Sequence, residues 1–567
     1  MRIKSLFIIA TGLVILTCPV SVRAAVPESI QNSQQQLINQ QLRDLEIQNA
    51  EKSSPFNKKN ISPDQEKTTK SPAEHCVNIK QIAFTGNTIL SHRQIYKITK
   101  SYETKCLYVT DINKMMNDIT NKYIDSGYIT SRAYIQMPQT RLSDGILDIR
   151  IIEGVIGKIT GMTAAEQITA FPVLQNKILN IRDIEQGLDQ INRLGSNHAT
   201  MDIKAAEAQD AVSNIDIKNT PSKPYEYDLT IDNYGTDFTG AWRSGAQFTR
   251  DNLFGLNDQI NFSLNHSISR FDERLSRSMM LGFSVPFGYW TFSNNSAYSY
   301  YKTSFPMPVS QNPFFSLGNS FINTTSVDRV LSRGQRYKLS ATAGLTYKNN
   351  ENFMQVYDLK ARNDASSRAL SIFNFDIPLS IYFPNGLIYV KPGIAQGTKL
   401  FDALDDSNSP YAGRAQYTAY KFYAYTGWNF NYLSLTSSLD SSWSNDELFS
   451  TETVYLGGAS TIRGFRNESI IGNSGFNVRN DLNFNLSKIF DSENFWYKSF
   501  TPGIFADFGS VYSKDNGNSR IAGSGVKLGF KYWLIDATAT YAKIIDRQNW
   551  MTENYNIYFY IGLSGRF

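Results

Sequence analysis

The chain has 567 residues and a formal net charge of +5, from 56 Lys and Arg against 51 Asp and Glu. Three of the positive charges, Arg2, Lys4 and Arg23, lie within the first 25 residues, so the rest is nearly neutral and does not indicate a nucleic-acid partner. The four histidines have no ligand partner at metal-binding spacing, and no G-x-S-x-G motif is present, so we predict no metal, no cofactor and no catalytic residue.

Residues 1–25 are predicted to be a secretory signal peptide. Two basic residues precede the almost wholly apolar stretch 6–16, and the small residues Ala24 and Ala25 supply a cleavage site. The apolar stretch is too short to serve comfortably as a retained membrane anchor. A lipoprotein anchored at Cys18 is a poor alternative, because Thr does not suit the position before the lipidated residue.

Two cysteines, Cys76 and Cys106, remain after signal-peptide removal. An exported chain reaches an oxidising compartment, so we expect these two to form a disulfide. Two free buried thiols are the alternative.

Residues 26–52 are predicted to form a helix with a thin apolar stripe, and the rest of its surface is Gln, Asn and charged residues. Such a helix does not build a core alone, so it lies either in a water-filled lumen or free of the protein. Residues 53–75 are rich in Ser, Pro, Lys and Glu without periodicity and are predicted to be a linker.

Two consecutive units of the order βααββ follow, over residues 76–153 and 154–222. In the first unit, Asp144-Gly145 is predicted to be the turn of a hairpin. The first unit is expected to have strands at 77–84, 129–136 and 146–152 and helices at 91–102 and 111–125. The second is expected to have strands at 155–159, 200–205 and 211–217 and helices at 164–178 and 182–194. Two such units in tandem form an internal repeat of architecture.

Residues 225–567 are predicted to form a transmembrane β-barrel. No apolar run is long enough for a membrane-spanning helix, whereas the chain contains 32 Tyr and 35 Phe that concentrate in this region. The stretch 337–348 alternates apolar and polar residues, and similar stretches occur at 229–234, 241–250, 259–268, 378–383, 387–397, 418–426, 430–440 and 526–533. The length suits 16 antiparallel strands, and by length alone 12 or 18 fit as well.

The last strand indicates which side chains face lipid. Odd positions from Tyr555 to Leu563 are apolar and can face lipid, while even positions can face a polar lumen. The chain ends on Phe567, which resembles the C-terminal assembly signal of bacterial outer-membrane proteins.

A glycine-rich stretch, LGGASTIRGF from Leu456 to Phe465, carries a single arginine, Arg463. An arginine at the tip of such a loop can donate two parallel hydrogen bonds to one carboxylate. We therefore predict that the loop folds into the barrel and that its arginine faces an acidic residue on the barrel wall. Asp507 is the candidate, because it shares a strand face with Phe505 and Gly509 and would be costly on the lipid face. A solvated loop arginine and a lone lumen carboxylate are the alternatives.

These residues resemble a known family. The stretch from Leu456 to Arg466, followed by VRNDL at 478–482, closely resembles the two-partner-secretion transporters (TpsB, the ShlB/FhaC/HecB haemolysin secretion/activation type) of the Omp85 superfamily. The stretches 123–134 and 142–147 and the paired cysteines extend the similarity over nearly the whole mature chain. The family usually has valine where Ile462 stands here.

The resemblance implies that the two βααββ units are periplasmic POTRA domains and that helix 26–52 is a lumen plug. It implies that Arg463, in the motif Ile462-Arg463-Gly464-Phe465, pairs with Asp507 of the F-x-D-x-G motif. Arg479 and Asp481 are secondary lumen candidates.

The resemblance also implies a function: an outer-membrane pore that exports a large β-rich exoprotein, such as a haemolysin, an adhesin or a contact-dependent toxin. Whether export activates this client is left open. Outer-membrane lipid, lipopolysaccharide and the outer-membrane assembly machinery are the other implied partners. An insertase for outer-membrane proteins is the alternative, although such proteins usually carry more POTRA units. A passive porin or receptor does not explain the repeats, and an enzyme is not expected.

Overall fold

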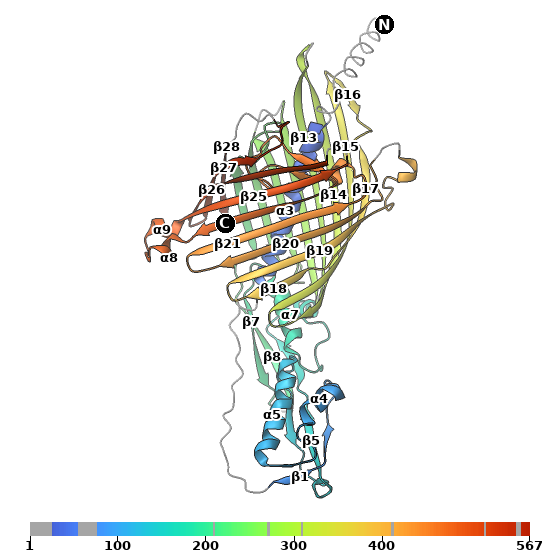
Figure 1. Cartoon of the computed structure of the whole chain (residues 1–567), viewed down its shortest axis with the longest axis vertical. Helices are drawn as coiled ribbons and strands as arrows, with labels where there is room; N and C mark the ends of the chain where they lie inside the picture. The colour runs from blue at the N-terminus through green and yellow to red at the C-terminus, as the bar shows by residue number, and fades with distance from the viewer. Residues whose placement is uncertain are drawn as a thin grey trace.

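The computed structural model describes residues 25–54, 76–207, 210–268, 273–307, 310–409, 413–514, 517–551 and 557–566. The predicted signal peptide up to residue 24, most of the predicted linker, and Phe567 lie outside the described residues. Figure 1 shows a β-barrel standing on a stalk of two small domains, with one long helix inside the barrel.

The first stalk domain has the predicted βααββ order with one addition, a short strand β3 between its two helices. Its main sheet has the order β2-β5-β4, with β2 parallel to β5 and β4 antiparallel to β5. Its core includes Met115, Ile119 and Tyr123, which are fully buried. The elements are β1 (Val77–Ile79), β2 (Gln81–Thr85), α4 (His92–Thr99), β3 (Lys105–Leu107), α5 (Val109–Asp125), β4 (Arg132–Ile135) and β5 (Ile146–Ile152). A disulfide joins Cys76 to Cys106, with their Cα atoms 5.3 Å apart, and so ties the start of β1 to β3.

Two local predictions in this domain are wrong. The single strand expected at 77–84 is divided, because β1 pairs with β3 whereas β2 pairs with β5. Asp144-Gly145 is not a two-residue hairpin turn but the end of a longer connection from β4. The side chain of Gln139 stabilises that connection by exchanging hydrogen bonds with the backbone of Asp148, donating at 2.6 Å and accepting at 3.0 Å.

The second stalk domain repeats the order in β6 (Val155–Thr160), α6 (Ala164–Ala170), α7 (Ile181–Asn192), β7 (Ala199–Ala205) and β8 (Val212–Asn219), with the sheet order β6-β8-β7. Thr163 begins α6 with a capping box to Glu166. The helix expected at 164–178 ends at Ala170, because Pro172 disfavours helical geometry at the residue before it.

Sixteen crossings form the closed antiparallel barrel within the described residues, which confirms the predicted fold class. The short β16, β17 and β18 together make one crossing. The barrel closes where β28 pairs with β9, over Gly562–Arg566. The strands are β9 (Tyr225–Asp232), β10 (Trp242–Asp251), β11 (Gln259–Ile268), β12 (Leu275–Phe287), β13 (Trp290–Met307), β14 (Ser310–Arg333), β15 (Tyr337–Val356), β16 (Leu359–Arg362), β17 (Arg368–Asp376), β18 (Leu379–Phe383), β19 (Gly386–Thr398), β20 (Thr418–Asn429), β21 (Leu433–Ser444), β24 (Ser474–Phe484), β25 (Phe500–Ser513), β26 (Gly517–Tyr532), β27 (Ile535–Asp546) and β28 (Ile557–Arg566).

The two faces of the barrel strands differ as predicted. In β28, Phe559 and Ile561 are exposed on the outer surface, whereas Tyr558 and Tyr560 are buried inside. The polar residues of β15, among them Ser340 and Thr346, line an interior cavity of about 530 Å³. An apolar outer surface and a polar interior are what a barrel in a lipid bilayer requires.

Helix α3 (Ala25–Lys52) lies inside the barrel (Figure 1). Lys391 on β19 donates to both carboxylate oxygens of Glu46 at 2.6 and 2.8 Å, and Gln31 donates to Asn352 at 2.8 Å. Ile38 and Ile47 pack against apolar residues of the wall. The helix therefore occupies the lumen through side-chain contacts along its length.

Candidate functional site: an arginine loop latched inside the barrel

The loop that connects β21 to β24 folds back into the barrel. The short antiparallel strands β22 (Val454–Leu456) and β23 (Ile470–Gly472) form its base, and residues 457–469 form its tip. Gly457, Gly458 and Gly464 have φ values of 148°, 93° and 109°, which L side chains rarely adopt. A Cβ atom on Gly457 would lie 2.6 Å from the carbonyl oxygen of Glu468, so this position requires glycine.

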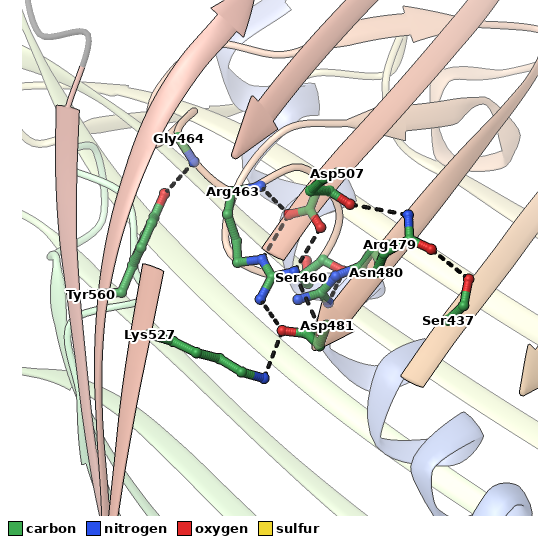
Figure 2. Close-up of polar contacts among 11 residues, drawn as sticks. Ser437, Ser460, Arg463, Gly464, Arg479, Asn480, Asp481, Asp507, Lys527 and Tyr560 are labelled. Atoms are coloured by element: carbon green, nitrogen blue, oxygen red, sulfur yellow. Dashed lines mark hydrogen bonds and ion pairs between the residues drawn. The ribbon is translucent and has the colours of Figure 1, made fainter. Parts of the chain in front are cut away.

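Arg463 lies at the tip and binds two carboxylates (Figure 2). Its Nε and Nη2 donate to the two oxygens of Asp507 at 2.7 and 2.6 Å, and its backbone N–H donates to Asp507 at 3.0 Å. Its Nη1 and Nη2 donate to Asp481 at 2.9 and 3.3 Å. All three guanidinium nitrogens therefore donate hydrogen bonds to the two carboxylates, an arrangement that the single ammonium group of a lysine cannot reproduce.

Asp481 shares its charge with a second cation. Lys527 on β26 donates to Asp481 on β24 at 2.7 Å. Two cations and two carboxylates therefore alternate in a row, Lys527–Asp481–Arg463–Asp507, and their charges sum to zero. The guanidinium carbon of Arg463 also lies 3.8 Å from the centre of the Phe505 ring, a cation–π contact. The Asp507 side chain is fully buried, and a buried carboxylate needs the hydrogen bonds and the opposite charge that Arg463 supplies.

Glycines on the barrel wall make room for the loop. A Cβ atom on Gly523 would lie 1.9 Å from the carbonyl oxygen of Arg463, and one on Gly509 would lie 2.6 Å from the Leu456 side chain. Gly509 belongs to the predicted F-x-D-x-G motif, whereas Gly523 on the next strand was not predicted. The motif therefore supplies a charge partner in Asp507 and space for the Leu456 side chain at Gly509, while Gly523 supplies the space for the loop backbone.

Apolar contacts hold the loop on either side of the arginine. Ile462 and Phe465 are fully buried. They belong to a cluster with Leu456, Ile470, Val511, Ile521, Ile544 and Met551. Gly464 adds a hydrogen bond, its N–H donating to the hydroxyl of Tyr560 at 3.3 Å. The apolar pair anchors the tip independently of the charge network.

The predicted secondary residue Arg479 plays a different part from Asp481. Its Nη1 donates to the carbonyl oxygen of Ser460 at 2.8 Å and so contacts the loop backbone. The plug helix reaches the same segment, because the Ser460 hydroxyl donates to Gln36 at 3.4 Å and the Gln36 amide donates to the carbonyl of Tyr455. The plug helix, the arginine loop and the barrel wall are thus in direct contact. The sequence analysis did not predict Lys527, Tyr560 or Gln36 as members of this site.

The comparisons with known proteins agree with this geometry. Residues 212–531 match the family described as haemolysin secretion/activation protein ShlB/FhaC/HecB. Residues 77–154 match the ShlB-type POTRA domain, and residues 146–205 match a POTRA domain.

Two curated relatives span most of the chain. The outer membrane transporter CdiB of Dickeya dadantii (strain 3937) is 32% identical over 418 residues, which cover 72% of each chain. The hemolysin transporter protein ShlB of Serratia marcescens is 28% identical and covers 80% of this chain and 79% of its own.

Two solved structures share the fold. CdiB from Escherichia coli is 25% identical and aligns with a TM-score of 0.82 over 95% of this chain and 98% of that chain. CdiB from Acinetobacter baumannii, at 19% identity, aligns with a TM-score of 0.77 and shows the fold alone. The family match over more than half of the chain, together with the relative at 32% identity, shows that this chain belongs to the ShlB/FhaC/HecB family of haemolysin secretion/activation proteins.

Proposed function

We propose that this chain exports one large, β-rich exoprotein across the bacterial outer membrane by two-partner secretion. The chain is an outer-membrane barrel with its POTRA domains in the periplasm. The observation that supports export most directly is helix α3, which lies in the lumen of the barrel and contacts the wall through its side chains. A stopper of this kind is suited to a pore that opens for a passing chain. It also favours export over assembly of outer-membrane proteins, in which the client leaves sideways.

The POTRA domains offer a physical route for client capture. Each three-stranded sheet has two outer strands, β2 and β4 in the first domain and β6 and β7 in the second, and no further strand of the described residues pairs with them. An extended client segment can add to such an edge as a further strand. The client then passes through the lumen unfolded and folds outside. The periplasm has no ATP, so outward folding supplies the direction of transport, and we infer no catalytic role for the chain.

In this proposal the latch keeps the arginine loop folded inside the lumen during transport. Lipopolysaccharide, outer-membrane lipid and the assembly machinery that inserts the barrel complete the proposed partners. The client is a secreted exoprotein of the kind that the transporter relatives export.

The test first searches the genes on either side of this one for a very large exported protein, and then measures export of that protein as the client. The chain and this client are expressed in a bacterium that lacks its own two-partner system, and the client is quantified in the medium and in the periplasm. The expected result is client in the medium only when the intact chain is present. A variant lacking residues 76–222 should insert its barrel yet leave the client in the periplasm. Client retained in the periplasm beside a correctly inserted intact chain would refute the proposal.

A further inference from the structure

A groove lies where the second POTRA domain meets the periplasmic rim of the barrel, on its outer side. It has a volume of about 520 Å³ and runs between the loop after α6 and the β12–β13 and β14 ends of the barrel. Its apolar lining includes Val173, Phe287, Trp290 and Leu331. All four side chains are exposed, Val173 at 78% and Leu331 at 52%. Exposed apolar residues gathered in one groove indicate a binding surface.

The two walls of the groove are fixed to each other. The N–H of Gly288, in the β12–β13 turn, donates to the carbonyl of Thr169 at 2.7 Å. The carbonyl of Gly288 accepts from the amides of Gln186 and Gln190 at 3.1 and 2.9 Å. A Cβ atom on Gly288 would lie 2.6 Å from the ring of Pro172, so the domain and the barrel touch closely here. The groove therefore lies at a fixed contact between the second POTRA domain and the barrel. Figure 1 shows this domain directly beneath the barrel.

The groove adjoins the outer face of the barrel strands. On β14, Phe321 and Leu331 lie on the exposed outer face, while Ile322 and Val330 are buried. Val173 belongs to the POTRA loop yet joins this apolar surface. Its φ of 55° is rare for a β-branched residue, so the loop keeps an unfavourable backbone conformation at this position. The groove thus lies at the level of the periplasmic turns, beside the outward-facing apolar pair Phe292 and Val327 of β13 and β14.

Two cations border the apolar lining. Arg329 pairs across the strands with Trp290, and its guanidinium carbon lies 4.8 Å from the centre of the Trp290 ring. Lys177 lines the groove from the POTRA loop. Neither cation forms an ion pair with a residue that the structure describes. The nearby carboxylate of Asp183 accepts a hydrogen bond from Tyr289 at 2.5 Å. Apolar walls with two unpaired cations at one side suit an amphiphile with a phosphate.

We propose that this groove binds one phospholipid of the inner leaflet, with its phosphate against Lys177 and Arg329 and an acyl chain along Phe287, Val173 and Leu331. The bound lipid connects the second POTRA domain to the membrane plane. It thereby sets the direction in which that domain presents a client to the barrel.

Native mass spectrometry of the full-length mature protein, titrated in detergent with phosphatidylglycerol, tests the proposal. The wild type should retain one phospholipid. The double variant Lys177→Ala/Arg329→Ala should bind it about thirtyfold more weakly, since each cation near a membrane surface contributes roughly one factor of five. The matched control Arg150→Ala/Lys531→Ala removes the same charges from exposed sites away from the groove and should bind like the wild type. Equal binding by both double variants would overturn the proposal.

A second measurement locates the lipid in vesicles of phosphatidylethanolamine and phosphatidylglycerol. A phosphatidylglycerol with a photoreactive diazirine on one acyl chain should cross-link preferentially to peptides containing residues 287–290 and 327–331. The variant Val173→Ser/Leu331→Ser should lose most of this preference while remaining heat-modifiable in gels, which reports a folded barrel. Cross-links spread evenly around the barrel in the wild type would contradict the assignment.

Discussion

Replacing Arg463 with alanine is expected to release the arginine loop from the barrel wall. Asp507 would lose both guanidinium hydrogen bonds while its side chain is fully buried. Removing one partner of a buried pair costs about 3–5 kcal/mol. Asp481 would be affected less, because it keeps Lys527. A shift of about 3 kcal/mol changes the ratio of latched to released loop by about 150-fold. Export of the client should therefore fall, while barrel insertion remains largely intact.

The assay measures three quantities in the same strains: client in the medium, heat-modifiability of the barrel, and accessibility of the loop. A cysteine introduced at Ser460 reports loop position through its reaction rate with a membrane-impermeant maleimide. The native Cys76 and Cys106 are joined in a disulfide and do not react. The expected result for Arg463→Ala is a normal barrel, faster labelling and reduced export.

Two further variants separate the charge network from general damage to the loop. Arg463→Ala/Asp507→Ala removes the unpaired carboxylate as well and should destabilise the latched loop less than Arg463→Ala alone. Arg466→Ala removes the same charge from the same loop, where the guanidinium donates to the carbonyls of Asn233 and Phe559 and lies over the rings of Tyr558 and Tyr560, and it should reduce export less than Arg463→Ala because it strands no buried carboxylate. If Arg463→Ala exports at the wild-type rate with an unlabelled loop, the reasoning is refuted.

Three other predictions address the plug, the space for the loop and the disulfide. Deleting residues 25–52 should raise single-channel conductance in planar bilayers, and unchanged conductance would count against a plug. Gly523→Val should release the loop as Arg463→Ala does, because its Cβ would lie 1.9 Å from the Arg463 carbonyl; Gly529→Val, with its nearest neighbour at 3.5 Å, is the control in the same maleimide assay. Cys106→Ser should destabilise the first POTRA domain by about 3–4 kcal/mol, seen as faster hydrogen exchange over residues 77–152. Exchange that matches the oxidised wild type would contradict the last expectation.

The barrel strands were predictable where lipid outside and water inside impose a clear alternation of apolar and polar residues. β28 and the first half of β15 have apolar residues on the outer face and polar residues inside, so period two is evident. β13 and β14 were not predicted. They extend over 18 and 24 residues, beyond the roughly 9–11 needed to cross a bilayer, and stretches such as SNNS place polar residues on both faces. Where polar residues occupy both faces of a strand, as at 293–296, the sequence has no period of two to detect.

The latch was predictable in part. Arg463 and Asp507 stand in short motifs, and the cost of a carboxylate on the lipid face places Asp507 inside. Lys527 was missed because its contact with Asp481 depends on the register of three neighbouring strands, which sequence spacing does not give. A signal was present on the same face of β26: Gly523 and Gly525 lack side chains where the loop backbone and Phe505 come close. Glycines at alternate positions of a strand indicate a second layer of chain inside a barrel.

The plug has one further consequence, which follows from its covalent attachment. Helix α3 binds the wall through separate contacts such as Glu46–Lys391, and residues 53–75 join it to the first POTRA domain. It is therefore a tethered ligand with an effective concentration in roughly the millimolar range. Such a ligand returns to its site within the same molecule, so the closed fraction does not depend on protein concentration. Modest affinity is sufficient to keep the pore shut, and modest affinity is also what allows a client to displace the helix.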